Sequence, residues 1–168
     1  MNHIILTGFM GSGKGAVAKG IAEALKLPIY DVDKMVGEKL KMSAADVYSR
    51  FGDVYARAEE TFILGELLQK KERGVIVLGS ALPLMTINDT ILKALGKVYW
   101  LKISKKTAVA AAQENNLEWV KGDIADVIGK MLKERDAAYK RISDVVMDAD
   151  AKTREEIIWD IVLKAGDK

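Results

Sequence analysis

The residues with the clearest chemistry lie near the start of the chain, where four glycines surround a single lysine. Residues 8–15 read Gly-Phe-Met-Gly-Ser-Gly-Lys-Gly, which fits the pattern G-x-x-x-x-G-K-[ST] at every fixed position except the last. In such a loop, backbone N–H groups surround phosphate groups and the lysine reaches the β- and γ-phosphates. The final Ser or Thr is a ligand of Mg²⁺, and Gly15 has no hydroxyl to offer. The sequence therefore predicts a nucleotide phosphate site without its direct metal ligand.

The elements around this loop are those that the motif requires. His3–Thr7 is an apolar run typical of a buried parallel strand, and residues 16–26 carry Val17, Ile21 and Leu25 at helical spacing. The free N–H groups and partial positive charge of that helix N-terminus would face the phosphates. The alternative is a glycine-rich turn without a ligand. We expect the nucleotide to contact Gly8, Gly11, Ser12, Gly13, Lys14, Gly15 and Ala16.

Two aspartates close the second predicted strand, at Asp31 and Asp33. Residues two apart on an extended segment point to the same side, so both carboxylates would face the phosphate loop. Together they could hold Mg²⁺ through water and orient or deprotonate an acceptor hydroxyl. Alternatively, Asp33 caps the helix that follows it, which leaves Asp31 unexplained. We favour the functional interpretation.

Two further segments offer weaker signals. Arg57 and Glu60 lie one turn apart in a predicted helix, and spacing alone favours an ordinary exposed ion pair of small energetic value. An arginine held by a carboxylate could instead bind an acidic substrate. The strand at residues 75–79 ends in Gly79-Ser80-Ala81, small residues that would let a ligand approach the backbone or would simply allow a tight turn.

The composition is that of one folded domain. The chain has 168 residues, 49% hydrophobic and 30% charged, with a net charge of +2 and no cysteine, so disulfides and thiolate chemistry are excluded. The lysines are scattered, which predicts no nucleic-acid surface, and no apolar run approaches the length of a membrane span. We expect a cytoplasmic protein that works as a monomer.

Apolar strand patterns alternate with helical ones along the chain, which predicts an α/β fold: helices on both faces of a five-stranded parallel sheet. On such a sheet, ligands bind beyond the carboxyl ends of the strands, where the residues above are found. The predicted strands are His3–Thr7, Pro28–Asp31, Val75–Gly79, Lys97–Ile103 and Asp144–Met147. The predicted helices are Lys14–Leu25, Lys34–Leu40, Ala44–Phe51, Val54–Lys71, Thr90–Leu95, Lys105–Glu114, Ile124–Ser143 and Thr153–Ala165.

Taken together, these segments resemble the shikimate kinase family, which has a P-loop, nucleoside monophosphate kinase-like fold. The likeness begins with residues 5–14 and continues through 27–34, Met42-Ser43 and the block from Phe51 to Glu60, where Ala56 replaces the usual phenylalanine. Arg135, Tyr139 and Ala149 echo the family's R-x-x-x-Y helix and the segment after it. The resemblance covers nearly the whole chain as one P-loop kinase domain, with a substrate-binding region near residues 33–62 and a lid near residues 112–122.

The resemblance implies phosphoryl transfer from ATP, with Mg²⁺, to the 3-hydroxyl of shikimate. Lys14 would neutralise the transferring phosphate, and Asp31 would help to hold Mg²⁺ through water. Asp33 would bind the shikimate hydroxyls near the attacking oxygen. The implied contacts of the acceptor are Asp33, Arg57, Gly79, Ser80 and Arg135, with the two arginines on its carboxylate.

Three departures from the family pattern fall on chemistry. Gly15 replaces the metal-ligating hydroxyl residue, Gly79-Ser80-Ala81 stands for three glycines, and residues 108–119 contain no lid arginine. Such an arginine is worth on the order of 10³-fold or more in phosphoryl transfer, so activity is expected to be reduced. Two alternatives stay open: a kinase for a different small hydroxylated acid, and a catalytically weak nucleotide-binding or regulatory homologue.

Overall fold

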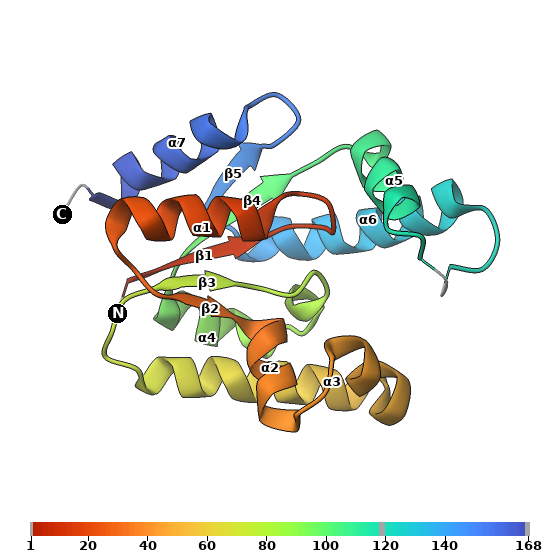
Figure 1. The fold of residues 1–168 in the computed structure, drawn as a ribbon, viewed down its shortest axis with the longest axis horizontal. Coiled ribbons are helices and arrows are strands. Elements are labelled where there is room, and N and C mark those ends of the chain that lie inside the picture. Colours follow the sequence, from red (N-terminus) through yellow and green to blue (C-terminus); the bar gives the residue numbers. More distant parts are fainter. Residues whose placement is uncertain (1, 118–119, 167–168) are drawn as a thin grey trace.

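The computed structural model describes residues 2–117 and 120–166. Its centre is a five-stranded parallel sheet with the strand order β2-β3-β1-β4-β5, which confirms the predicted fold class (Figure 1). The strands are β1 (His3–Thr7), β2 (Ile29–Asp31), β3 (Val75–Val77), β4 (Gly96–Lys102) and β5 (Val145–Asp148). Among the described residues, none of the helices combines the length and apolar character that crossing a membrane requires.

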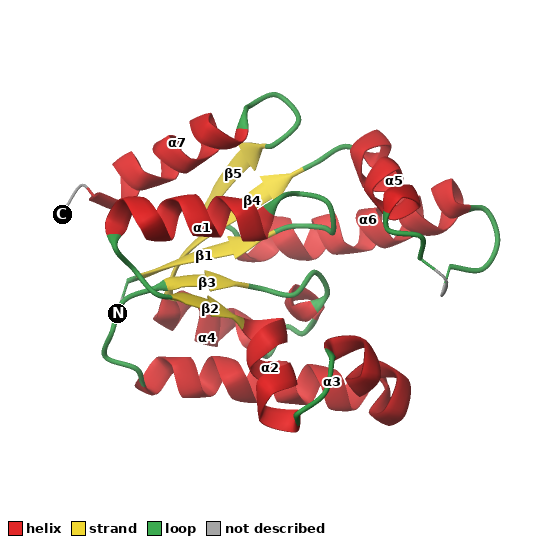
Figure 2. Cartoon of the chain, in the orientation of Figure 1, coloured by secondary structure: helices red, strands yellow, loops and turns green. Residues whose placement is uncertain are grey.

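Each face of the sheet buries its own apolar core, because side chains alternate along a strand. Ile4 and Leu6 of β1 pack with helices α1 (Lys14–Leu25) and α7 (Arg154–Gly166) on one face. Ile5 packs with α3 (Ala44–Gln69) and α4 (Asn88–Leu95) on the other. In Figure 2 the strands lie between these two layers of helices. The phosphate loop is thus carried by a strand that is buried on both sides.

The remaining helices begin at or beyond the carboxyl edge of the sheet. Helix α2 (Val32–Leu40) follows β2 and packs against α3. Helices α5 (Lys105–Glu114) and α6 (Ile124–Ile142) pack together and project to one side in Figure 1. A third apolar cluster joins them to the phosphate loop through Phe9, Trp100 and Tyr139. This cluster fixes α6 against the loop that follows β1.

The predicted elements are present, with differences at their ends. Strand β3 stops at Val77, and the small residues after it lead into a 3₁₀ turn, η1 (Leu82–Leu84), that the sequence analysis did not predict. Helix α2 begins at Val32, two residues before its predicted start. The two predicted helices after residue 44 form one element that is interrupted at Gly52, where φ is 82° and ψ is 174°. Gly52 is therefore the break that separates the two helical segments.

Candidate active site

Three loops meet at the carboxyl edge of the sheet because β2, β3 and β1 are neighbours. The phosphate loop follows β1. Asp31 is the last residue of β2, and Asp33 comes just after it. The Gly79–Ala81 segment follows β3. Ligands of open α/β sheets bind at this edge. The topology brings together segments that are separated by up to about seventy residues in the sequence.

The phosphate loop presents the N-terminus of α1 to this edge. Gly13 caps the helix with φ 82° and ψ 16°, a left-handed conformation that favours glycine. The first intrahelical bond runs from Val17 N to Gly13 O at 3.0 Å, so helix geometry leaves the N–H groups of Lys14, Gly15 and Ala16 for a ligand. Such a helix start is suited to binding an anion.

Lys14 lies folded over its own loop. Its Nζ donates to Gly8 O at 2.6 Å and to Phe9 O at 3.3 Å. Burial lowers the pKa of Lys14 to about 8, against the attraction of Asp33 and Asp31 and with a further lowering by Arg135. The ammonium is therefore held in a weakly solvated position among three charged groups from two other segments, where an added anion would stabilise its charge.

The two aspartates differ in their local structure, and the premise that both sit on an extended segment is wrong. Asp31 is the N-cap of α2, where its Oδ1 accepts from Lys34 N at 3.3 Å. The capping alternative therefore applies to Asp31 rather than to Asp33. Asp33 lies in the first helical turn and lines a cavity. Burial raises the pKa of the Asp33 carboxyl, as does Asp31, while Lys14 and Arg57 lower it.

Arg57 and Glu60 form a buried ion pair, so the expectation of an exposed pair is wrong. Their exposed fractions are 7% and 3%. Arg57 Nη1 lies 2.7 and 2.6 Å from the two carboxylate oxygens of Glu60, and Nη2 lies 3.2 Å from Asp53 Oδ1. A buried charge needs such partners. The pair is held rigidly at a cavity wall, which is the arrangement that an arginine needs to bind an acidic ligand.

Tyr48 completes this wall, and the sequence analysis missed it. Its ring lies under the guanidinium of Arg57, with the Arg57 Cζ 4.9 Å from the ring centroid, and its hydroxyl is 3.3 Å from Glu60 Oε1. Ala56, in the place of the family's phenylalanine, also lies beside Tyr48. Helical spacing could not have indicated it, because the break at Gly52 separates Tyr48 from Arg57 and Glu60.

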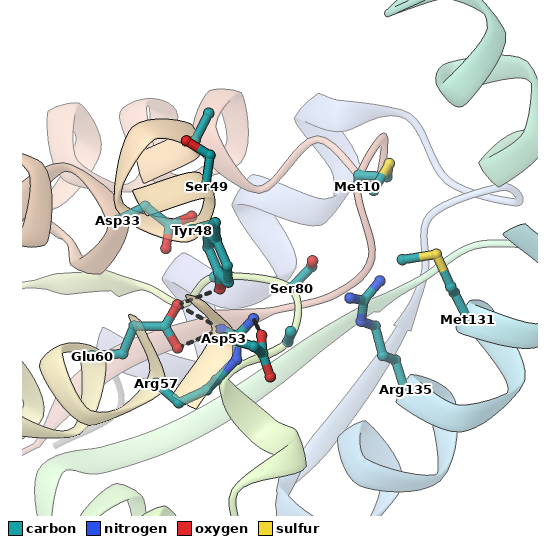
Figure 3. Close-up of a pocket in the computed structure, with 13 residues that line it drawn as sticks. Met10, Asp33, Tyr48, Ser49, Asp53, Arg57, Glu60, Ser80, Met131 and Arg135 are labelled. Carbon is teal, nitrogen blue, oxygen red and sulfur yellow. Dashed lines mark hydrogen bonds and ion pairs between the residues drawn. The ribbon is translucent and has the colours of Figure 1, made fainter. Parts of the chain in front are cut away.

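The wall surrounds an open cavity of about 560 Å³. Figure 3 shows the cluster from α2 and α3 on one side, Met131 and Arg135 of α6 on the other, and Ser80 between them. All five of the predicted acceptor residues line this cavity. The lining residues are Met10, Asp33, Ala45, Tyr48, Ser49, Asp53, Arg57, Glu60, Gly79, Ser80, Ala81, Met131 and Arg135.

Arg135 faces the cavity with spare donors. Its guanidinium carbon lies 5.4 Å from the centroid of the Phe9 ring, and its Nε and Nη1 are buried without a hydrogen-bond partner among the described residues. Burial lowers its pKa. Because unpaired buried donors are destabilising, the site is arranged to receive an acceptor group from a ligand, whereas Arg57 already bonds to Glu60 and Asp53.

The Gly79–Ala81 segment forms the floor between these walls. A Cβ at Gly79 would lie 2.5 Å from Asp33 Oδ1, so a side chain there would displace the Asp33 carboxylate. Ser80 stands at the second position of this segment, where the family has a glycine. It points its side chain toward the cavity in Figure 3. The added side chains therefore alter the cavity surface without filling the cavity.

The residues that would hold Mg²⁺ are few. No cluster of three or more His, Asp or Glu side chains suited to a metal occurs in residues 2–117 and 120–166. Mg²⁺ usually takes one or two carboxylates and completes its shell with phosphates and water. Asp31, 24% exposed in its side chain, fits that role. At Gly15, a Cβ would meet no described atom within 4 Å. Residues 118–119 of the predicted lid lie outside the described residues.

Comparison with known proteins identifies the family. The family model for shikimate kinase matches residues 10–165. A shikimate kinase of Sulfurihydrogenibium sp. (strain YO3AOP1) is 31% identical over 164 residues, which cover 98% of each chain. A shikimate kinase of Caldanaerobacter subterraneus subsp. tengcongensis is 30% identical over 165 residues, 96% of this chain and 95% of the relative.

Solved structures agree in fold. Shikimate kinase from Acinetobacter baumannii in complex with shikimate superposes with a TM-score of 0.88 and 23% identity, over 100% of this chain and 95% of that chain. Shikimate kinase from Aquifex aeolicus vf5 has a TM-score of 0.79 and 26% identity, over 98% and 96%. With the P-loop, the paired aspartates and the arginine-lined cavity in place, the chain belongs to the shikimate kinase family.

Proposed function

We propose that this protein transfers the γ-phosphoryl group of ATP to the 3-hydroxyl of shikimate and releases ADP and shikimate 3-phosphate. The observation that carries the proposal is the cavity itself. It joins Arg135, whose Nε and Nη1 have no hydrogen-bond partner among the described residues, and the half-buried carboxylate of Asp33 to Met10 of the phosphate loop. An acidic, hydroxylated acceptor matches these groups in charge and hydrogen bonding.

On the acceptor side, each wall has a separate task. Arg57 and Arg135 would bind the carboxylate, with Glu60 and Asp53 keeping Arg57 in place. Asp33 would hold the acceptor hydroxyl and accept its proton as the oxygen attacks. The raised pKa of Asp33 suits that role, because a general base works best when its pKa lies close to the working pH.

On the donor side, the N–H groups at the start of α1 would bind the phosphates, and the ammonium of Lys14 would leave its loop carbonyls to contact the transferring group. Mg²⁺, when held by the phosphates and by Asp31 through water, would supply further positive charge to the phosphate oxygens. Positioning and charge stabilisation account for most of catalysis in phosphoryl transfer.

A coupled assay of ADP release tests the proposal directly. With ATP and Mg²⁺ present, release by the unmodified protein is expected to depend on added shikimate and to saturate with it. The control is the same mixture without shikimate, which measures simple ATP hydrolysis. Equal ADP release with and without shikimate would contradict the proposed reaction.

A second candidate is phosphorylation of a different small hydroxylated acid. The side chain of Ser80 and the hydroxyl of Tyr48 give the cavity wall polar groups, and these could select an acceptor with another arrangement of hydroxyls. A panel of hydroxylated carboxylic acids in the same assay would reveal this activity as ADP release with one of them in place of shikimate.

Gly15→Ser is expected to strengthen Mg²⁺-dependent ATP binding and to raise kcat by about tenfold, because the new hydroxyl can become a metal ligand. The position is open to a side chain and lies in regular helix. Mg²⁺ titrations of ATP affinity and of ADP release measure the effect.

Gly15→Ala is the matched control for that variant. Alanine brings at least as large a gain in helix propensity, about 0.5–1 kcal/mol relative to glycine, without a hydroxyl. Similar Mg²⁺ dependence in the Ser and Ala variants would show that the missing hydroxyl is already compensated.

ATP affinity is expected to weaken above pH 8. The pKa of Lys14 is about 8 in the free protein, and bound phosphates favour the charged form, so binding above that pH requires proton uptake. By linkage, the Kd for ATP stays constant with respect to this group below pH 8 and rises by about tenfold per pH unit above it. Calorimetric titrations in two buffers of different ionisation enthalpy measure the proton uptake. The Lys14→Gln variant should lack it, and a pH-independent Kd from pH 7.5 to 9.5 in the unmodified protein would contradict the assignment.

A further inference from the structure

A buried tyrosine of α6 contacts the floor of the acceptor cavity. Tyr139 is fully buried, and its hydroxyl donates to the carbonyl of Ser80 at 2.5 Å, across 59 positions of sequence. The phosphoryl transfer proposed above uses no atom of Tyr139. A short hydrogen bond from a buried phenol to a loop carbonyl that borders the cavity therefore calls for a separate explanation.

Arg141 of α6 and Asn88 hold the turn after the floor, through Pro83 O at 2.6 Å and Leu82 O at 3.4 Å, but the described hydrogen bonds of residues 79–81 are few. The last bond that ties this segment to the sheet runs from Leu78 N to Leu6 O at 3.0 Å. Beyond it, Gly79 O accepts from Leu82 N at 3.3 Å and Ala81 O accepts from Leu84 N at 3.0 Å. Both of these bonds are local to the turn. The Ser80 carbonyl, in contrast, is held from another element of the fold.

The orientation of this segment matters because of what lies against it. The backbone at Gly79 approaches Asp33 so closely that a Cβ would lie 2.5 Å from its Oδ1. A trans peptide is planar, with its C=O and N–H pointing in opposite directions. Fixing the Ser80 carbonyl on α6 therefore fixes which way the following N–H points, and with it the backbone surface that an acceptor would meet.

Tyr139 is itself held by the packing of its ring. Its ring packs against Trp100, with centroids 5.7 Å apart, and it belongs to the same apolar cluster as Phe9 of the phosphate loop. Arg135 lies one helical turn earlier on α6, so both residues share a face of this helix. A single rigid helix thus carries the spare guanidinium of the cavity and the donor that holds the cavity floor.

We propose that Tyr139 is a positioning residue for the acceptor: its hydroxyl holds the Gly79–Ala81 segment against Asp33 and keeps it in register with Arg135. The inference rests on the proposed kinase function. Loss of the hydroxyl would leave the Ser80 carbonyl without its partner and let the peptide turn, which weakens acceptor binding while the P-loop stays intact.

The test compares Tyr139→Phe with Tyr99→Phe. Both substitutions remove one hydroxyl from a buried ring, but Tyr99 lies on β4 beside a small cavity lined by Asn2, His3 and Arg73 at the other edge of the sheet. For Tyr139→Phe, KM for shikimate is expected to rise about tenfold, as for loss of one buried hydrogen bond. The fall in kcat should stay below about threefold, and the Kd for ATP should not change. Tyr99→Phe should leave all three unchanged.

A purely structural role would give a different pattern. If Tyr139→Phe lowers Tm but leaves KM for shikimate at the value of the unmodified protein, the inference is overturned. The same holds if KM for shikimate and Kd for ATP rise together. If the unmodified protein shows no shikimate-dependent ADP release, the proposed function fails instead, and a measurement without an acceptor becomes decisive.

That measurement is amide hydrogen exchange over residues 78–84, which reports local opening. Exchange there is expected to be at least about tenfold faster in Tyr139→Phe than in the unmodified protein and in Tyr99→Phe. Equal rates would overturn the inference whatever the reaction is.

If Tyr139→Phe does not fold, 3-fluorotyrosine in the unmodified chain gives a ¹⁹F signal for Tyr139, assigned by replacing the other four tyrosines in turn. In a protein that shows shikimate-dependent ADP release, failure of this signal to move with saturating shikimate would equally overturn the inference.

Discussion

Asp33→Asn is expected to lower kcat for shikimate phosphorylation by about 10²- to 10⁴-fold, the range that general-base catalysis contributes. The asparagine keeps the size of the side chain and can still hydrogen-bond the acceptor, so KM should change much less than kcat. Burial and the neighbouring Asp31 raise the pKa of Asp33, which places its titration on the acid side of the activity profile. The kcat of the unmodified protein should therefore fall as pH drops through that pKa, and the variant should lack this limb.

The control for Asp33→Asn is Asp46→Asn. Asp46 is an exposed aspartate in the first turn of α3, and its substitution leaves the cavity unchanged. Both variants should keep the ATP affinity of the unmodified protein. A kcat within about threefold of the original in Asp33→Asn would exclude Asp33 as the base and favour direct attack by an acceptor that loses its proton to water or to the transferring phosphate.

The fold was predictable from sequence because its signals are local. The strand at residues 3–7, the glycine loop and the helix after it follow one another within 25 residues, and each has its own periodicity. The break at Gly52 could also be predicted, since glycine interrupts the helical pattern there. The sequence analysis missed η1 because three residues of 3₁₀ turn have no periodicity to detect.

The site was less predictable because burial depends on distant segments. The spacing of Arg57 and Glu60 is that of a common surface pair, and only the packing of α3 against α2 and the sheet removes both from solvent. The two aspartates show the same limit. Their spacing suggested one shared face, but helix α2 begins between them. As a result, Asp31 caps the helix and Asp33 lines the cavity. The bond from Tyr139 to Ser80 has no sequence signal at all.

The departures from the family pattern concentrate on the phosphate side of the site. Gly15 lacks the hydroxyl that the family pattern leads one to expect, and residues 108–117 lack the arginine. In contrast, Asp33, Arg57 and Arg135 are all present around the acceptor cavity. Positive charge at the transferring group is therefore scarce. Among the side chains near the phosphate loop, Lys14 must contribute a larger share of it than in a site with a lid arginine.

Lys14→Met is accordingly expected to reduce kcat/KM by about 10³-fold or more, the effect of removing a cation that stabilises developing charge in a water-excluded site. Methionine has a similar reach and keeps the apolar contacts of the stem.

The stability of the Lys14→Met variant should move in the opposite direction. Burial lowers the pKa of Lys14 to about 8. Below pH 8 the folded protein therefore holds a poorly solvated charge, which water solvates freely in the unfolded chain. Removing that charge should raise Tm. Lys19→Met, an exposed lysine on the same helix, should change neither quantity. Loss of activity together with a higher Tm would show that the charge is kept for the reaction rather than for the fold. Loss of activity with a lower Tm would mean that the bonds from Lys14 to Gly8 and Phe9 hold the loop together, and that Lys14 acts chiefly through the loop's shape.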